Sequence, residues 1–365
     1  MCKKLVLAIV FLLVVPGMAL SVEVYSDGER SLDVGFWGQA WYQWIEDGSA
    51  SGNKDLNDFM VRRAYMGING TITPMLDFSV NYAIDKAGKD AKANNDIQLR
   101  DAYLRAKLAG EALMVNAGRM WVPIGRTPST KCLLSLDLDW TRGGLAGGAF
   151  FPSVAANRDD GVMLWGNVAN DMLRYRLMIA DGIDGPNNPD DKLRYAGQVS
   201  VSLFDPETGY FNPETYIGEK NVLSVLASFD MQDKLTSGDY RAWTAGVHYD
   251  QAIGGGAITA DVAYTDIRHG TQSITYTNMS PGDNADIISA KAGYLFPIDL
   301  QPVIHYEMVS VDKEKDTAIY GVGVNYFIKG NANKLSLDVT QVDQEKEIGN
   351  TKDRVVVTAQ MAVGF

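Results

Sequence analysis

The sequence predicts an all-β protein, a transmembrane antiparallel up-and-down β-barrel of about 16 strands with an inward-folded long third loop. Three observations predict this fold class. Apolar and polar residues alternate with period two along nearly the whole chain, and each alternating segment has roughly the ~9–11 residues that a tilted strand needs to cross a bilayer. Aromatic residues gather near the segment ends, where barrels carry interfacial girdles.

Composition narrows the class of protein further. The 365 residues include 33 Lys+Arg against 45 Asp+Glu, a formal net charge of -12, and this acidic balance argues against nucleic-acid binding. Only 2 Cys and 3 His are present, which excludes a disulfide scaffold, a cysteine-rich zinc protein and most histidine metal sites. The mean hydropathy of -0.11 is too polar for a bundle of membrane-spanning helices.

The first element is an export signal over residues 1–21. Two lysines precede an apolar run over residues 5–15, and a Pro-Gly pair ends the run before small residues. This order is typical of a secretory signal peptide. The alternative is a membrane anchor, but the run is shorter than the ~20 residues of a spanning helix. We therefore expect residues 22–365 to form a single outer-membrane β-barrel domain.

Sixteen alternating segments follow the signal. In the first of them, Tyr42 and Trp44 lie on one face while Gln39 and Gln43 lie on the other. A β-sandwich also alternates, and the same rhythm allows about 14 or about 18 strands. An even number places both ends of a bacterial barrel on the periplasmic side, and this size class leaves an aqueous channel. The predicted strands cover residues 32–45, 58–73, 76–86, 95–109, 112–119, 158–169, 172–180, 191–204, 219–230, 239–251, 256–268, 284–295, 299–310, 316–328, 333–343 and 353–365.

The connections between these segments alternate between short turns and longer polar loops, as periplasmic turns and extracellular loops do. One connection on the expected periplasmic side, 205–218, is longer than the others, and its role is not predicted. The chain ends on Phe365, which resembles the terminal aromatic signal by which outer-membrane barrels are recognised for assembly. The longer links cover residues 46–57, 87–94, 120–157, 181–190, 231–238, 269–283, 311–315 and 344–352.

The longest link, 120–157, is expected to fold into the barrel. Its aromatic residues Trp121, Trp140, Phe150 and Phe151 are too numerous for a loop that is free in water. Long loops without secondary structure are usually functional or disordered. An inward loop packs on the wall and narrows the lumen, whereas the alternative is a surface loop at a subunit interface.

Basic residues are concentrated before residue 195. Residues 58–194 hold 17 basic and 16 acidic residues, against 12 and 22 in residues 195–365. Rings of Arg or Lys in a pore favour anions, and the guanidinium fork suits phosphate or carboxylate. Acidic neighbours such as Asp101, Asp137, Asp139, Asp159 and Asp160 can neutralise this charge, which leaves non-selective passage as the alternative. The candidate lining residues are Arg63, Arg105, Lys107, Arg119, Arg126, Lys131, Arg142, Arg158, Arg174 and Arg176.

Four segments carry a family resemblance: FMVRRAYMGING at 59–70, RDAYLRA at 100–106, AGRMWVPIG at 117–125 and ANRDDGVMLWG at 156–166. Taken together and in this order, they resemble the phosphate-selective porin O and P family. The resemblance implies a sixteen-stranded trimeric porin with an inward-folded third loop and an arginine-lined anion path. It also implies that Arg63, Arg105 and Arg126 line this path.

The predicted function is an outer-membrane porin, a water-filled channel for passive diffusion of small hydrophilic solutes, with weak preference for anions such as phosphate. The expected partners are outer-membrane lipid, lipopolysaccharide, the solutes and other copies in a homotrimer, with no nucleic acid. We expect no catalytic residue, no metal and no cofactor. The alternative is a structural, adhesive or enzymatic barrel. An enzyme needs a nucleophile beside a base, and His248, His269 and His305 have no nucleophile motif near them.

Overall fold

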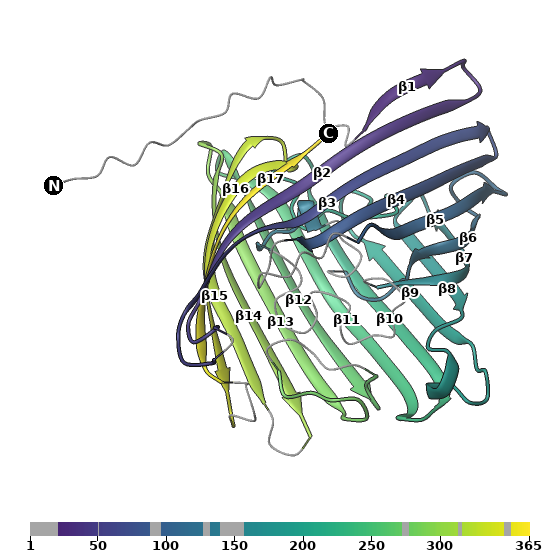
Figure 1. The fold of residues 1–365 in the computed structure, drawn as a ribbon. Coiled ribbons are helices and arrows are strands. Elements are labelled where there is room, and N and C mark those ends of the chain that lie inside the picture. The colour runs from purple at the N-terminus through teal and green to yellow at the C-terminus, as the bar shows by residue number, and fades with distance from the viewer. Residues whose placement is uncertain are drawn as a thin grey trace.

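The computed structural model describes residues 21–49, 51–87, 96–126, 132–138, 157–271, 277–312, 316–346 and 352–365. Their strands form one antiparallel sheet that closes into a barrel (Figure 1). The ring is β2 (Ser31–Ile45), β3 (Leu56–Thr73), β4 (Leu76–Ala87), β5 (Gln98–Lys107), β6 (Met114–Trp121), β7 (Arg158–Val168), β8 (Leu173–Ala180), β9 (Arg194–Ser202), β10 (Val222–Leu235), β11 (Gly238–Ile253), β12 (Gly256–Arg268), β13 (Ala285–Leu295), β14 (Leu300–Val311), β15 (Thr317–Lys329), β16 (Asn333–Gln344) and β17 (Arg354–Gly364).

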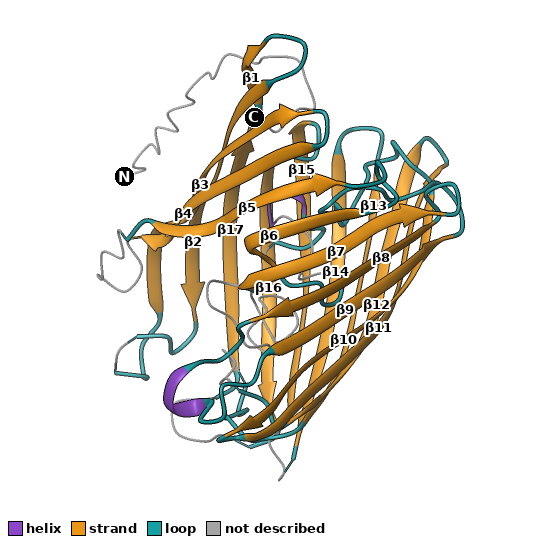
Figure 2. Cartoon of the chain, turned by 90° about the vertical axis from the view of Figure 1, so that its right-hand side faces the viewer, coloured by secondary structure: helices purple, strands orange, loops and turns teal. Residues whose placement is uncertain are grey.

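Closure of the ring depends on the pairing of its first and last strands. Strand β17 pairs with β2 from Val356 opposite Ile45 to Gly364 opposite Trp37, and every other neighbour in the ring is consecutive in sequence (Figure 2). A closed barrel leaves no open strand edge in lipid. The predicted fold class of a sixteen-stranded antiparallel barrel is therefore confirmed, and the strand bounds agree with the prediction to within a few residues.

Two details of the fold differ from the prediction. A further strand, β1 (Val22–Ser26), forms a hairpin with the start of β2, and each of its five residues is exposed. The predicted long link at 231–238 is instead a tight turn, because β10 continues to Leu235 and β11 begins at Gly238. The polar residues of this extension suggested a loop, but they can belong to a strand because the barrel interior accepts polar side chains. Gln232, for example, is fully buried there.

Helical structure is minor in the described ranges. It consists of two 3-10 turns, η3 (Cys132–Leu134) and η4 (Gly185–Asn187). Among these residues no helix is long and apolar enough to cross a bilayer. Residues 1–20 of the predicted signal peptide, together with most of the 120–157 loop, lie outside the described residues.

Two β-bulges break the alternation on the basic part of the wall. In β3, Gln39 pairs with Arg63 while Ala40 pairs with Val61, so Arg62 is an extra residue in this strand of the ladder. In β5, Arg100 is extra in the same way beside Asp101. A bulge reverses the facing of the residues that follow it. As a result, two consecutive charged residues are buried at each position.

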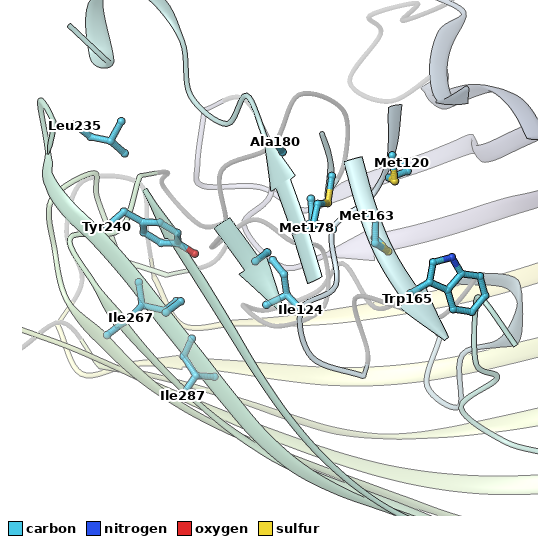
Figure 3. Packing of buried hydrophobic residues seen from close by; sticks show 14 of the residues in the cluster. Met120, Ile124, Met163, Trp165, Met178, Ala180, Leu235, Tyr240, Ile267 and Ile287 are labelled. Carbon is cyan, nitrogen blue, oxygen red and sulfur yellow. The ribbon is translucent and has the colours of Figure 1, made fainter. Parts of the chain in front are cut away.

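The inner face of the barrel is packed as well as polar. Buried apolar side chains from β5 round to β14 form one cluster inside the wall (Figure 3). Ile124, which follows β6, belongs to this cluster and is completely buried together with Ile267 and Ile287. The outer face instead exposes apolar side chains, such as Val162 at 50% and Ile304 at 61%, as a lipid-facing surface requires.

Candidate functional site

Four arginines line the inner face where β3, β5 and β7 face the lumen, and we call Arg62, Arg63, Arg100 and Arg158 the basic wall. All four are buried. Arg63 donates to Oε1 of Gln39 at 3.2 Å, and its Nε lies 3.6 Å from Asp85. Arg100 also pairs with Asp85. Arg62 lies over the ring of Trp41, with its guanidinium carbon 5.3 Å from the ring centroid.

Arg158 completes the basic wall by pairing with Asp101. Its Nε and Nη2 lie 3.1 and 3.2 Å from the two carboxylate oxygens. These contacts join the guanidinium groups of Arg63 and Arg100 to Asp85 and that of Arg158 to Asp101. Buried charges are tolerated only when they are paired and hydrogen-bonded. The ion pairs and hydrogen bonds therefore hold these guanidinium groups in place on the inner face.

Arg105 and Lys107 lie farther along β5 and are more accessible. Their side chains are 23% and 33% exposed. Arg105 Nε donates to both oxygens of Asp77, at 2.8 and 3.0 Å, and Lys107 Nζ lies 3.6 Å from the same carboxylate. Two cations thus share Asp77, although Glu111 also lies 4.0 Å from Lys107.

Arg119 does not lie on the inner face. Alternation along β6 turns Asn116 and Met120 inward, which places Arg119 on the opposite face. There it pairs with Asp160, with contacts of 2.8 and 2.6 Å, two residue pairs away from exposed Val162 along the ladder. The expectation that Arg119 lines the channel therefore needs correction: its strand position directs it to the outside of the barrel.

Arg126, Arg174 and Arg176 contact the long connection between β9 and β10, residues 203–221, which we call the β9–β10 insert. Arg126 makes two 2.7 Å hydrogen bonds to Glu207 and a third, of 2.9 Å, to the carbonyl of Pro213. Arg174 Nη1 donates to the carbonyls of Glu207 and Gly209, at 2.8 and 3.0 Å. These arginines, expected as pathway residues, use their hydrogen bonds to hold the insert.

Part of the 120–157 loop lies inside the barrel. In the stretch 132–138, Asn325 of β15 donates to the carbonyl of Leu136 at 2.8 Å, and Lys334 of β16 donates to the carbonyl of Ser135. Leu138 packs against Trp41 and Met60 from the inner faces of β2 and β3. Lys131 and Arg142, the remaining candidate lining residues, lie outside the described residues.

Sequence reasoning missed four basic residues of the interior, namely Arg62, Arg100, Lys291 and Lys334. Arg62 and Arg100 each stand beside a second charged residue in an otherwise alternating strand, and this doublet is the signal by which their bulges were detectable. Lys291 Nζ lies 2.8 Å from Glu214 and 3.5 Å from Asp137. No local pattern signals this contact, since its partners come from two distant connections.

The described residues do not bring metal ligands together. They hold no group of three or more His, Cys, Asp or Glu side chains that could bind a metal ion. The two histidines of the inner face contact carboxylates: His248 Nδ1 lies 3.3 Å from Asp261 and His305 Nε2 lies 3.1 Å from Asp338. The acidic segment 312–316 is described only at its two ends.

Comparison with known proteins gives a family match over almost the whole chain. The sequence profile of Gram-negative porins matches residues 7–364. No curated protein sequence matches. The profile match identifies a porin in general, and the phosphate-selective O and P family suggested by the motifs is not shown by it.

Several solved structures share the fold at low identity. Salmonella typhi OmpF, in complex with daunomycin, is 15% identical with a TM-score of 0.61, over 93% of this chain and 100% of that chain. The anion-selective porin from Comamonas acidovorans is 11% identical with a TM-score of 0.61, over 92% and 100%. A trimer form of OmpT from Vibrio cholerae is 12% identical with a TM-score of 0.54, over 92% and 99%. At these identities the likeness concerns the fold alone.

Proposed function

The chain belongs to the Gram-negative porin family and is therefore a channel protein of the bacterial outer membrane. From this premise we propose that it passes small hydrophilic solutes by passive diffusion, with a weak preference for anions such as phosphate. We also propose that residues 1–21 are removed on export, that residues 22–365 form the mature barrel, and that the protein is a homotrimer in contact with lipid and lipopolysaccharide.

The observation that carries the anion preference is the basic face of β3 and β5. Six basic side chains gather on this part of the inner face, and the two more accessible ones, Arg105 and Lys107, are 23% and 33% exposed and share Asp77; the other four are Arg62, Arg63, Arg100 and Arg158. Charges near a low-dielectric wall focus the potential along the lumen and attract ions of the opposite sign. The net charge of -12 works against this local field, so the expected preference is weak.

The trimer proposal draws on a structurally similar protein. OmpT of Vibrio cholerae, folded in vitro, has a trimer form. A trimer of open channels closes and opens in three equal steps, so single-channel records of the native assembly test this proposal directly. Steps of one size with no grouping in threes would contradict it.

The test of selectivity is a reversal potential measured in planar bilayers under a salt gradient. A double variant, Arg63→Ala with Arg105→Ala, is expected to shift the reversal potential towards cation preference, and more strongly at about 0.1 M than at 1 M salt because screening shortens the range of charge. Arg119→Ala is the matched control, since this arginine lies on the outer face. An unchanged potential in the double variant would remove these residues from the pathway. No conductance from folded protein would favour a structural or adhesive barrel.

A further inference from the structure

The β9–β10 insert is unlike a normal turn at its end of the barrel. The equivalent turns between β3 and β4, or between β11 and β12, hold two residues, while the insert covers residues 203–221. Ladder pairing continues only into its base, where Leu203 N donates to the carbonyl of Leu223 at 2.7 Å and Asp205 N to that of Asn221 at 2.8 Å. Beyond Asp205 the chain enters the barrel.

One side of the insert is bound to strands β5 to β8. The ring of Tyr210 packs against Tyr103 of β5 and Trp165 of β7, with centroids 5.6 and 5.5 Å apart. Arg176 of β8 donates to the Tyr210 carbonyl at 2.6 Å, and its guanidinium lies over the ring of Trp121 at 5.2 Å. These side chains belong to the inner face of the barrel.

The other side of the insert is bound to strands β12 to β15. Glu214 pairs with Lys291 of β13 at 2.8 Å. Thr215 accepts a hydrogen bond of 3.1 Å from Thr259 of β12, and its carbonyl accepts one of 2.6 Å from Asn331, in the turn after β15. Tyr210 and Glu214 are close in sequence, and the chain between them spans at most about 14 Å. Long side chains from the wall cover the remaining distance.

These two anchors lie on opposite sides of the lumen. In a ring of sixteen strands, β5 and β13 stand eight positions apart, so a segment that touches both crosses the interior. The insert also meets the inward stretch of the other loop: Leu136 N donates to Glu214 at 2.9 Å, and Glu214 N donates to the carbonyl of Leu134 at 3.0 Å.

The hydrogen bonding explains why arginines hold this segment. Residues 206–217 contain neither helix nor strand, and buried carbonyls without ladder partners need other donors. Arg174 and Arg176 supply them: together they donate to the carbonyls of Glu207, Gly209 and Tyr210. Within the described ranges Arg176 forms no ion pair with a carboxylate. Its charge is therefore stabilised by the carbonyls of the insert, by Oε1 of Gln198 at 2.6 Å and by the aromatic rings around it.

We propose that the β9–β10 insert is a second constriction, which crosses the lumen from the end opposite the 120–157 loop and limits the bore of the channel. Arg126, Arg174, Arg176 and Lys291 are its positioning residues. This inference builds on the proposed channel function and assigns a size limit, rather than a charge preference, to a segment separate from the basic wall.

The experiment compares three variants of the full-length protein by single-channel conductance and by the exclusion limit for neutral sugars in liposome swelling. The first replaces residues 206–220 with Asn-Gly, which closes the hairpin where Asp205 and Asn221 already pair. The second is Tyr210→Ala with Phe211→Ala, which keeps the backbone and removes bulk. The matched control is Phe204→Ala, because this phenylalanine lies in the same segment but is 47% exposed. Heat-modifiable migration in gels verifies that each variant is folded.

The shortened variant is expected to raise conductance about twofold or more and to admit larger sugars, because a sixteen-stranded barrel otherwise leaves an open aqueous lumen. The aromatic variant is expected to give a smaller rise, and the control none. If the shortened variant does not fold, the aromatic variant decides. Unchanged conductance and sugar exclusion in the folded variants would overturn the proposal. Conductance that appears only after shortening would support the constriction and overturn the open-channel function, whereas silence of every protein would overturn both.

Discussion

The ion pair between Arg126 and Glu207 allows a quantitative test of how the insert is held. Both side chains are buried, at 6% and 0% exposure, and are joined by two 2.7 Å hydrogen bonds. Replacing Glu207 with Gln removes the nearer carboxylate from Arg126 and leaves that of Asp261, whose Oδ2 lies 3.9 Å from Nε. Loss of one partner of a buried pair costs about 3–5 kcal/mol, and we take the lower bound because the amide oxygen still accepts one hydrogen bond.

This cost predicts a local change that amide hydrogen exchange can measure. About 3 kcal/mol corresponds to roughly two powers of ten in the ratio of docked to undocked insert. We therefore expect the amides of residues 206–217 to exchange about 100-fold faster in Glu207→Gln, measured by mass spectrometry on protein in lipid nanodiscs. The double variant Arg126→Met with Glu207→Leu is expected to restore part of the protection, since apolar side chains of similar volume replace a buried pair at little cost, while Tyr216 and the Pro213 carbonyl each lose one hydrogen bond.

The control for this experiment is an exposed pair of the same type. Arg241 and Asp233 form an ion pair with side chains 42% and 55% exposed, and such pairs contribute about 0–1 kcal/mol. Asp233→Asn should leave exchange in the insert unchanged. If Glu207→Gln exchanged no faster than Asp233→Asn, or if the double variant exchanged as fast as the single one, the ion pair would not be what holds the insert.

Two further predictions follow from the same contacts and from one tight strand position. Burial raises the pKa of Glu214, and the neighbouring charge of Lys291 offsets this rise only in part. For Glu207, the charge of Arg126 outweighs the effect of burial and holds the pKa below its ordinary 4.5. A raised carboxyl pKa makes docking stronger as pH falls through it. A lowered pKa contributes stability that is complete well above 4.5 and is lost progressively as pH falls from about 4.5 towards the lower value. Protection of residues 206–217, corrected for intrinsic exchange, should therefore hold or rise between about pH 7 and 5; a decrease would contradict these pKa shifts. Gly118 has φ +126°, and a Cβ there would lie 2.3 Å from the Ala102 carbonyl, so Gly118→Ala should cost more than about 1 kcal/mol. In urea unfolding, Gly118→Ala should lose more free energy of unfolding than Gly330→Ala, where φ is also positive but the space around the Cβ is open. Equal losses in the two variants would exclude the clash.

The barrel itself was readable in the sequence because strand facing is a local property. Each residue of a strand points opposite to its neighbours, so Tyr42 and Trp44 against Gln39 and Gln43 already define an outer and an inner face. Burial in the structure agrees with this division: Gln39 and Gln43 are 1% and 5% exposed. The even number of segments and their short turns favour a barrel, and the predicted strands agree closely with the observed ones; closure itself is shown by the pairing of β17 with β2.

The position of individual charges depended on information that is not local. The charged doublet at Arg62 and Arg63 hints at a bulge, but its position is set by the register against β2. Arg119 follows the simple alternation and points outward, although its neighbourhood in sequence suggested the lumen.

The roles of Arg174, Arg176 and Lys291 were decided only by tertiary structure. Alternation places Arg174 and Arg176 on the inner face, but whether an inward arginine meets water or a buried carbonyl depends on which segment fills the lumen. That segment, the β9–β10 insert, has no periodic pattern, and its partners lie as far away in sequence as Lys291 and Asn331. Sequence alone therefore determined the wall of this protein, because hydrophobic alternation is repeated in every strand. What occupies the interior was decided by contacts between distant segments, which only the closed barrel brings together.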